Sequence, residues 1–154
     1  MKITTRIGLL LLGAALCAPV AANDPNEGLI KARKGEMQVR SFNAGPLFAM
    51  ARGKMAYDAE LAATSANNLK TMLTVSMGRA WKQGTDNGAY DSTRALPEIW
   101  SSWPKVSEAG KAYAKAVNEL AAVAGNGLDA MKPAVGNLGK TCKGCHDDFR
   151  AEAK

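Results

Sequence analysis

The chain has 154 residues, of which 22% are charged, and its 20 basic and 14 acidic side chains give a formal net charge of +6. A chain of this length holds one domain with one core. Charges of both signs are mixed along it. It lacks the basic patch with interleaved aromatic residues that is typical of nucleic-acid binding, so we expect no nucleic-acid partner.

The first segment, residues 1–22, has the pattern of a secretory signal peptide. Lys2 and Arg6 precede an apolar run, and small residues end the segment near Ala22. The apolar run is too short for a transmembrane helix, so we expect no stable membrane insertion. We predict cleavage near Ala22 and export. This leaves one domain, residues 23–154, whose formal net charge is +4 because the segment carries two basic residues and no acidic one.

Apolar residues recur at intervals of three and four along this domain, which predicts helices. Asp58 is a suitable N-cap for the second helix, and Gly125-Asn126-Gly127 stops the third. Gly45-Pro46 should kink or locally open the first helix. Short first and third connections and one long middle crossing predict an all-α fold, an antiparallel four-helix bundle. The expected helices cover residues 26–52, 58–77, 104–124 and 129–151.

The long middle crossing, residues 78–103, breaks the helical pattern with several turn-forming residues. A loop of this length in a small domain is usually functional or is held by its own side chains. Three tryptophans could hold it, namely Trp81, Trp100 and Trp103.

The last expected helix contains Cys142-Lys143-Gly144-Cys145-His146, and C-x-x-C-H is the attachment signature of a c-type heme. In such a site two thiols bond the porphyrin vinyl groups and the histidine ligates the iron. At ~100° per residue, a helix places Cys145 about 60° to one side of Cys142 and His146 about 40° to the other, so all three address one face. His146 is the single histidine of the chain.

The same helix has the most regular apolar spacing in the chain, with alternating steps of three and four. Both cysteines occupy this seam, which should face the bundle interior. The heme should therefore lie inside the bundle, near the C-terminal helix, rather than on a surface loop. The seam consists of Leu128, Met131, Val135, Leu138, Cys142, Cys145 and Phe149.

Two other uses of paired cysteines fit less well. A thioredoxin-like redox pair would need a βαβ context, and a zinc site would need four ligands. The domain has no visible strand pattern and offers two cysteines and one histidine. We therefore predict one covalently attached heme c.

A C-terminal C-x-x-C-H on the last helix of a four-helix bundle resembles the class II c-type cytochromes, the cytochrome c prime family. Tyr57-Asp58-Ala59, Leu96-Pro97-Glu98-Ile99-Trp100 and the stretch from Cys142 to Arg150 are similar to the family's stretches. The resemblance covers essentially the whole mature chain. It implies heme attachment outside the cytoplasm, hence a periplasmic protein, and it leaves open a homodimer paired through the first two helices.

In this family either an apolar side chain or a methionine on the first helix faces the iron opposite the histidine. The family's arginine on that helix matches Arg33, and the residue four positions on is Met37. The resemblance therefore implies His146 and Met37 as axial ligands, as in the low-spin members. The alternative is that Met37 fills the core, as helical methionines usually do.

The resemblance also implies roles for two arginines. Arg33 matches a residue near the heme propionates, where a guanidinium can pair with a carboxylate. Arg150 matches a basic residue that flanks the proximal histidine. The alternative for both is a solvated arginine on a helix surface.

The two distal arrangements predict two functions. With Met37 on the iron the protein is an electron carrier, because a saturated iron changes oxidation state without binding substrate. Basic residues of the first and last helices, Arg40 among them, could then steer an acidic redox partner. Without that ligand, a five-coordinate high-spin heme could bind nitric oxide or carbon monoxide. We do not expect an enzyme, because no second histidine offers distal acid-base chemistry.

Overall fold

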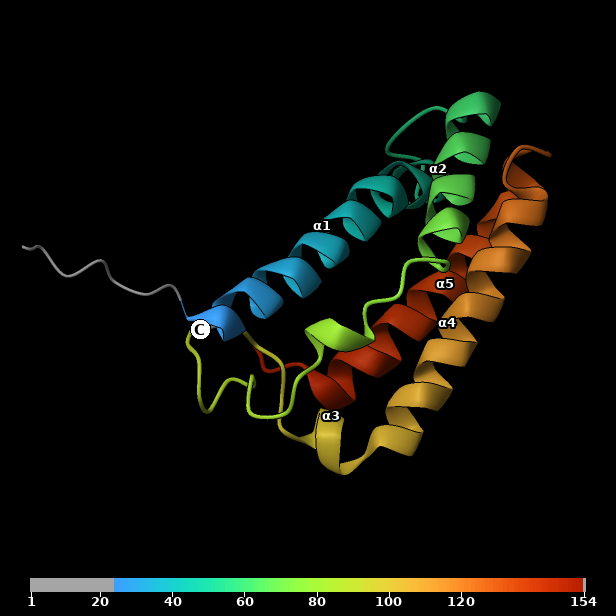
Figure 1. Ribbon diagram of the computed structural model, residues 1–154. Helices are drawn as coiled ribbons and strands as arrows, with labels where there is room; N and C mark the ends of the chain where they lie inside the picture. Colours follow the sequence, from blue (N-terminus) through green and yellow to red (C-terminus); the bar gives the residue numbers. More distant parts are fainter. Residues whose placement is uncertain (1–23, 154) are drawn as a thin grey trace, which may run out of the picture.

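The structure is a computed structural model that describes residues 24–153. The predicted signal peptide lies outside the described residues. Among the long helices, α1 packs on α2 and α5, and α4 packs on α2 and α5; neighbouring helices run in opposite directions (Figure 1). The predicted all-α bundle of four antiparallel helices is confirmed. The elements are α1 (Pro25–Ala51), α2 (Ala59–Met72), the 3-10 helix η1 (Gly78–Ala80), α3 (Glu98–Ser101), α4 (Trp103–Val123) and α5 (Leu128–Phe149).

The two ends of α2 show how local chemistry decides where a helix starts and stops. The Asp58 carboxylate accepts a hydrogen bond of 2.9 Å from a backbone N–H of the first turn, which confirms the predicted N-cap. The prediction that α2 continues to about Met77 is wrong, because the helix ends at Met72. Thr74 Oγ1 donates to the Thr71 carbonyl (2.8 Å), and such side-chain bonds compete with the helical backbone pattern.

Proline does not interrupt α1 where the sequence suggested a local opening. Pro46 lacks a backbone N–H, yet the helix is continuous over its whole length. Asn43 and Leu47, on either side of the proline, are buried. Asn43 also accepts a hydrogen bond from the Asn68 side chain on α2 (2.9 Å). Packing against α2 therefore keeps this part of α1 helical.

The hydrophobic core is in two separate parts. The seam of α5 contributes to both, because its early positions enter the first part and its last position enters the second. The main core cluster consists of Leu47, Met50, Ala62, Ala66, Leu69, Ala116, Val117, Leu120, Ala124, Met131, Val135 and Leu138. The second core cluster consists of Ala95, Ile99 and Phe149, with Trp81, Trp100, Val106 and Cys145 packed against it.

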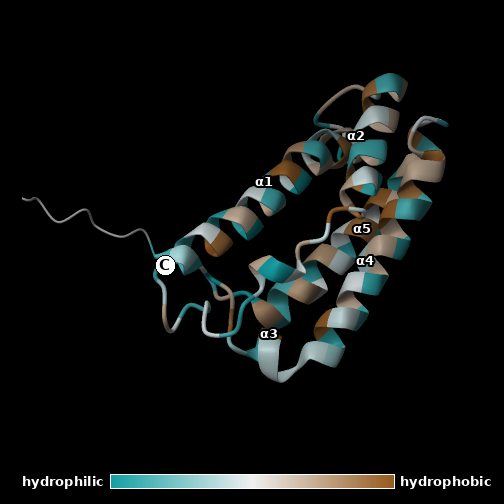
Figure 2. Ribbon diagram, viewed as in Figure 1, coloured by the Kyte–Doolittle hydropathy of each residue, from teal (hydrophilic) through white to brown (hydrophobic). Residues whose placement is uncertain are grey.

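Figure 2 shows hydrophilic and hydrophobic residues interspersed along each of the long helices. This distribution is typical of helices with one buried and one exposed face, because the apolar positions recur every three or four residues. Among the described residues, no helix is both long enough and apolar enough to cross a membrane.

Tyr57 fastens the start of α2 to the turn between α4 and α5. Its hydroxyl donates to the Ala124 carbonyl and accepts from the Gly127 N–H, both at 2.9 Å. Gly127 has a φ of 107°, a conformation that strains residues with a side chain. One phenol therefore holds helix ends that lie 67 and 70 residues away from it in the chain.

Tyr57→Phe should lower the free energy of unfolding by about 1–3 kcal/mol, because it leaves a carbonyl and an N–H without their partner at a part-buried site. Chemical denaturation followed by circular dichroism measures this change. The matched control is Tyr90→Phe, which removes a hydroxyl bound to Asp24 and Asn26 at the start of α1 and should destabilise less. Equal losses in the two variants would contradict the role given to Tyr57.

Candidate functional site

The predicted attachment residues lie together on α5, between the two core clusters. Cys142 and Cys145 are free thiols of intermediate burial. Cys142 packs against the main core cluster, whereas Cys145 packs against the second. His146 follows directly and is also partly buried. A prosthetic group bonded to both sulfurs would therefore contact both parts of the core.

The surroundings of these three residues favour their uncharged forms. Burial raises the pKa of both thiols, and the positive charge of Arg40 offsets part of this effect. Burial lowers the pKa of His146, and Arg150 and Arg94 lower it further. A neutral imidazole is the form that ligates a metal, and a thioether carries no charge. The residues present therefore fit a covalently attached heme.

Met37 lies on the same side of α1 as the buried Arg33, but it is not packed into the core. Its side chain is 40% exposed. It belongs to neither core cluster, so the structure does not support the alternative that Met37 fills the core. Ligation of iron by its sulfur stays a prediction.

A charged pair lies next to Met37 on α1. Arg40 Nη2 is 2.6 Å from Glu36 Oε1, and the Glu36 side chain is only 7% exposed. The guanidinium carbon of Arg40 is 4.6 Å from the centroid of the Tyr113 ring on α4. The sequence suggested a surface charge at Arg40. Arg40 lies three residues after Met37 and seven after Arg33, so the three share one helical face. This spacing could have indicated from the sequence that Arg40 lies beside Met37.

Arg33 is 3% exposed, so the alternative of a solvated surface arginine is wrong for this residue. Its guanidinium donates to the Ala80 carbonyl (3.3 Å), to Thr85 Oγ1 (2.6 Å) and to Thr93 Oγ1 (3.1 Å). It also donates to the Thr85 carbonyl. Burial lowers the pKa of this guanidinium. Arg33 thus ties α1 to the long connection, and a role toward a heme propionate stays a prediction.

Two tryptophans complete this tie. The guanidinium carbon of Arg33 is 5.0 Å from the centroid of the Trp81 ring and 6.0 Å from that of Trp100. Trp100 Nε1 donates to the Trp81 carbonyl (2.9 Å). These two tryptophans hold the long connection as the sequence suggested. Trp103 instead begins α4 and is half exposed.

The long connection is also tied to the end of α5. Ala95 and Arg150 form an antiparallel bridge, with backbone hydrogen bonds of 3.0 and 2.8 Å on either side of it. The Arg150 side chain is exposed and lines an open polar hollow of 610 Å³ together with His146. The structure therefore places Arg150 beside the predicted proximal histidine.

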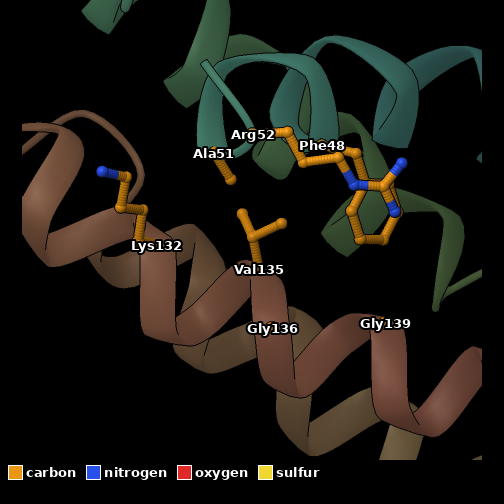
Figure 3. Close-up of a pocket in the computed structure, with 7 residues that line it drawn as sticks. All are labelled: Phe48, Ala51, Arg52, Lys132, Val135, Gly136 and Gly139. Atoms are coloured by element: carbon orange, nitrogen blue, oxygen red, sulfur yellow. The ribbon is translucent and has the colours of Figure 1, made fainter. Parts of the chain in front are cut away.

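A second hollow, of 410 Å³, lies between the end of α1 and the first half of α5 (Figure 3). Phe48 packs closely on Gly139 there, where an added Cβ would come within 3.2 Å of the ring. This hollow contains none of the predicted site residues. Among residues 24–153, no group of three or more His, Cys, Asp and Glu side chains could hold a bare metal ion. The lining residues are Phe48, Ala51, Arg52, Lys132, Val135, Gly136 and Gly139.

Known proteins resemble this chain over most of its length. The sequence profile of the family described as cytochrome C′ matches residues 28–150. Cytochrome c′ of Cereibacter sphaeroides is 38% identical over 147 residues, which cover 96% of this chain and 98% of that protein. The solved cytochrome c′ from Rhodobacter sphaeroides is 37% identical, has a TM-score of 0.81, and the match covers 83% of this chain and 98% of that one.

Two other solved relatives carry information on ligands and assembly. A ferrous arginine-to-lysine variant of cytochrome c prime from Alcaligenes xylosoxidans, with nitric oxide bound, is 27% identical with a TM-score of 0.71. The match covers 83% of this chain and 97% of that chain. A cytochrome c′ with an unusual ligand-controlled dimer dissociation is 30% identical with a TM-score of 0.74. That match covers 86% of this chain and 100% of that one.

Arg33→Met should lower the free energy of unfolding by about 2–4 kcal/mol, because several hydrogen bonds to a charged group are lost and buried acceptors are left unpaired. Urea denaturation of the purified protein measures this loss. Lys31→Met, an exposed position on the same helix, is the control and should change the stability by no more than about 0.5 kcal/mol. Equal stability of the two variants would show that Arg33 does not hold the long connection.

Proposed function

The chain belongs to the cytochrome c′ family and carries one covalent heme c, and on this premise we propose that its iron is five-coordinate and high-spin and binds nitric oxide or carbon monoxide. Cys142 and Cys145 would hold the heme through thioether bonds, and His146 would be the axial ligand. Membership of this family also confirms the expectation that the protein is not an enzyme.

The observation that carries this proposal is the kinship with cytochromes c′, one of which holds a gas. The Alcaligenes xylosoxidans variant has nitric oxide bound in its ferrous form. A relative of the same family name reaches 38% identity over nearly the whole chain. The sequence alone put electron transfer first, with His146 and Met37 on the iron. The relatives support gas binding better.

The described residues suit a pocket for small neutral gases. Burial and two nearby arginines lower the pKa of His146, which favours the neutral imidazole that can ligate iron from one side. From α1, the thioether of Met37 would cover the other side. A thioether donates no hydrogen bond and its unbranched chain adapts its conformation, so it can exclude water and still move aside for a diatomic molecule. The heme supplies the iron that takes the gas.

Electron transfer is the second candidate, and Met37 is the observation that favours it. Its side chain lies outside both core clusters, and a thioether is a normal axial partner of histidine in cytochromes, where it raises the reduction potential. An acidic redox partner would suit a chain with an excess of basic residues.

A periplasmic location and a homodimer belong to the same proposal. The predicted signal peptide at residues 1–22 supports export. Apolar side chains left exposed on α1 and α2, namely Val39, Phe42 and Leu61, support pairing of two copies through these helices, because a second copy would cover them. A related cytochrome c′ undergoes ligand-controlled dimer dissociation.

Cys142→Ala and Cys145→Ala should each impair covalent retention of heme, because each removes one of the two thioether bonds. The variants are exported from cells that contain a heme-ligation system, denatured, and stained for heme after gel electrophoresis. Cys17→Ala is the matched control and should retain heme fully, since Cys17 lies in the predicted signal peptide. Undiminished heme in both test variants would reject the attachment site.

The visible spectrum of the ferrous protein separates the two candidate functions. We expect a high-spin spectrum and rapid binding of carbon monoxide in the wild type. Met37→Ala should stay high-spin and bind carbon monoxide faster, because a side chain that covers the iron is removed. Met55→Ala, an exposed methionine in a turn, should behave as wild type.

The opposite result would establish electron transfer. In that case the wild type is low-spin and slow to bind carbon monoxide, and Met37→Ala converts it to a high-spin protein with a lower reduction potential.

A further inference from the structure

Arg40 is a charged side chain beside Met37, where the proposed function needs only an apolar cover. The two residues are three positions apart on α1 and therefore lie about 60° apart around the helix. The Arg40 side chain is 24% exposed. Its guanidinium carbon lies 4.6 Å from the centroid of the Tyr113 ring, so it occupies the space between α1 and α4.

The contacts of this guanidinium leave a buried donor, the Nε–H, without a partner among the described residues. Nη2 pairs with Glu36 Oε1 at 2.6 Å, and the Glu36 side chain is itself almost fully buried. The guanidinium stacks on the Tyr113 ring. Nε is buried and has no hydrogen-bond partner among the described residues. An unpaired buried donor is destabilising, and more so on a charged group, so this atom indicates an acceptor that belongs to the loaded site.

The position of Arg40 argues against a heme propionate as this acceptor. Tyr113, the ring under the Arg40 guanidinium, and Cys142 both pack against the main core cluster, and the charge of Arg40 offsets part of the effect of burial on the pKa of Cys142. Arg40 therefore lies near the first thiol. In heme, the vinyl groups that bond to thiols and the propionates occupy opposite edges of the porphyrin. Met37, the neighbour of Arg40 on α1, is the residue that the proposed function places over the iron. The position of Arg40 beside Met37 therefore favours a ligand on that iron as the acceptor.

We propose that Arg40 is a distal hydrogen-bond donor, giving its Nε–H to the diatomic ligand while Glu36 holds the guanidinium in place. This inference rests on the proposed function and deepens it. A cationic donor stabilises electron density that the iron passes to the ligand. Arg40 would therefore favour gases whose outer atom gains negative charge on binding, and the distal side would not be uniformly apolar.

Infrared spectroscopy of the ferrous holoprotein with carbon monoxide bound tests this role. A positive donor near the outer atom lowers the C–O stretching frequency, because the iron donates more electron density into the ligand. Arg40→Leu should shift the stretch to higher frequency. Arg40→Lys keeps the charge but lacks the Nε–H, and should give a smaller upward shift. Arg52→Leu removes another arginine that stacks on a ring, that of Phe48, and should leave the frequency unchanged.

The possible results separate this inference from the proposed function. An unchanged C–O stretch in Arg40→Leu that still binds carbon monoxide overturns the inference and leaves the proposed function standing. Wild-type ferrous protein that binds no carbon monoxide overturns both. Should Arg40→Leu fail to retain heme, Arg40→Lys decides, and an unshifted stretch in that variant overturns the inference.

Discussion

The break in the hydrophobic core is the constraint on which the rest of the structure depends. α5 contributes apolar side chains to both core clusters, and Cys142 and Cys145 lie where the clusters separate. A small bundle depends for its stability on burying enough apolar surface in one domain, so a divided core favours a group that joins its parts. A heme bonded to both sulfurs is such a group. This would explain why the predicted attachment residues occupy the inward seam of a helix and not a loop.

The long connection between α2 and α4 links the two sides of the site. Arg33 holds it to α1 through hydrogen bonds to residues 47 to 60 positions away in the chain. The bridge between Ala95 and Arg150 holds it to the end of α5, just beyond His146. One segment therefore positions both α1, which carries Met37, and the last turn of α5, which carries the predicted proximal histidine. A long loop held at both ends by buried contacts behaves as part of the scaffold.

The proposed distal side combines an apolar thioether with a charged pair, and this combination bears on both candidate functions. At the proposed distal position, the positive charge of Arg40 would favour the ferrous state, because removing an electron adds positive charge close to it. Glu36 offsets part of that charge through its contact with Arg40. Gas binding and electron transfer both use the ferrous state, so the pair is compatible with either. The position of the Met37 sulfur, on the iron or merely over it, is the difference between the two.

The sequence by itself determined the features that depend on residues close together in the chain. The four helices, the Asp58 cap and the placement of both cysteines on one seam follow from helical periodicity and from the hydrogen-bonding chemistry of single side chains. The tertiary structure decided what depends on distant neighbours. It showed that Pro46 is accommodated by packing against α2, that Arg33 is buried by the long connection, and that Arg40 turns toward Tyr113 on α4. These contacts join segments that helical periodicity cannot relate, because a repeat of 3.6 residues defines a face but not the partner that covers it.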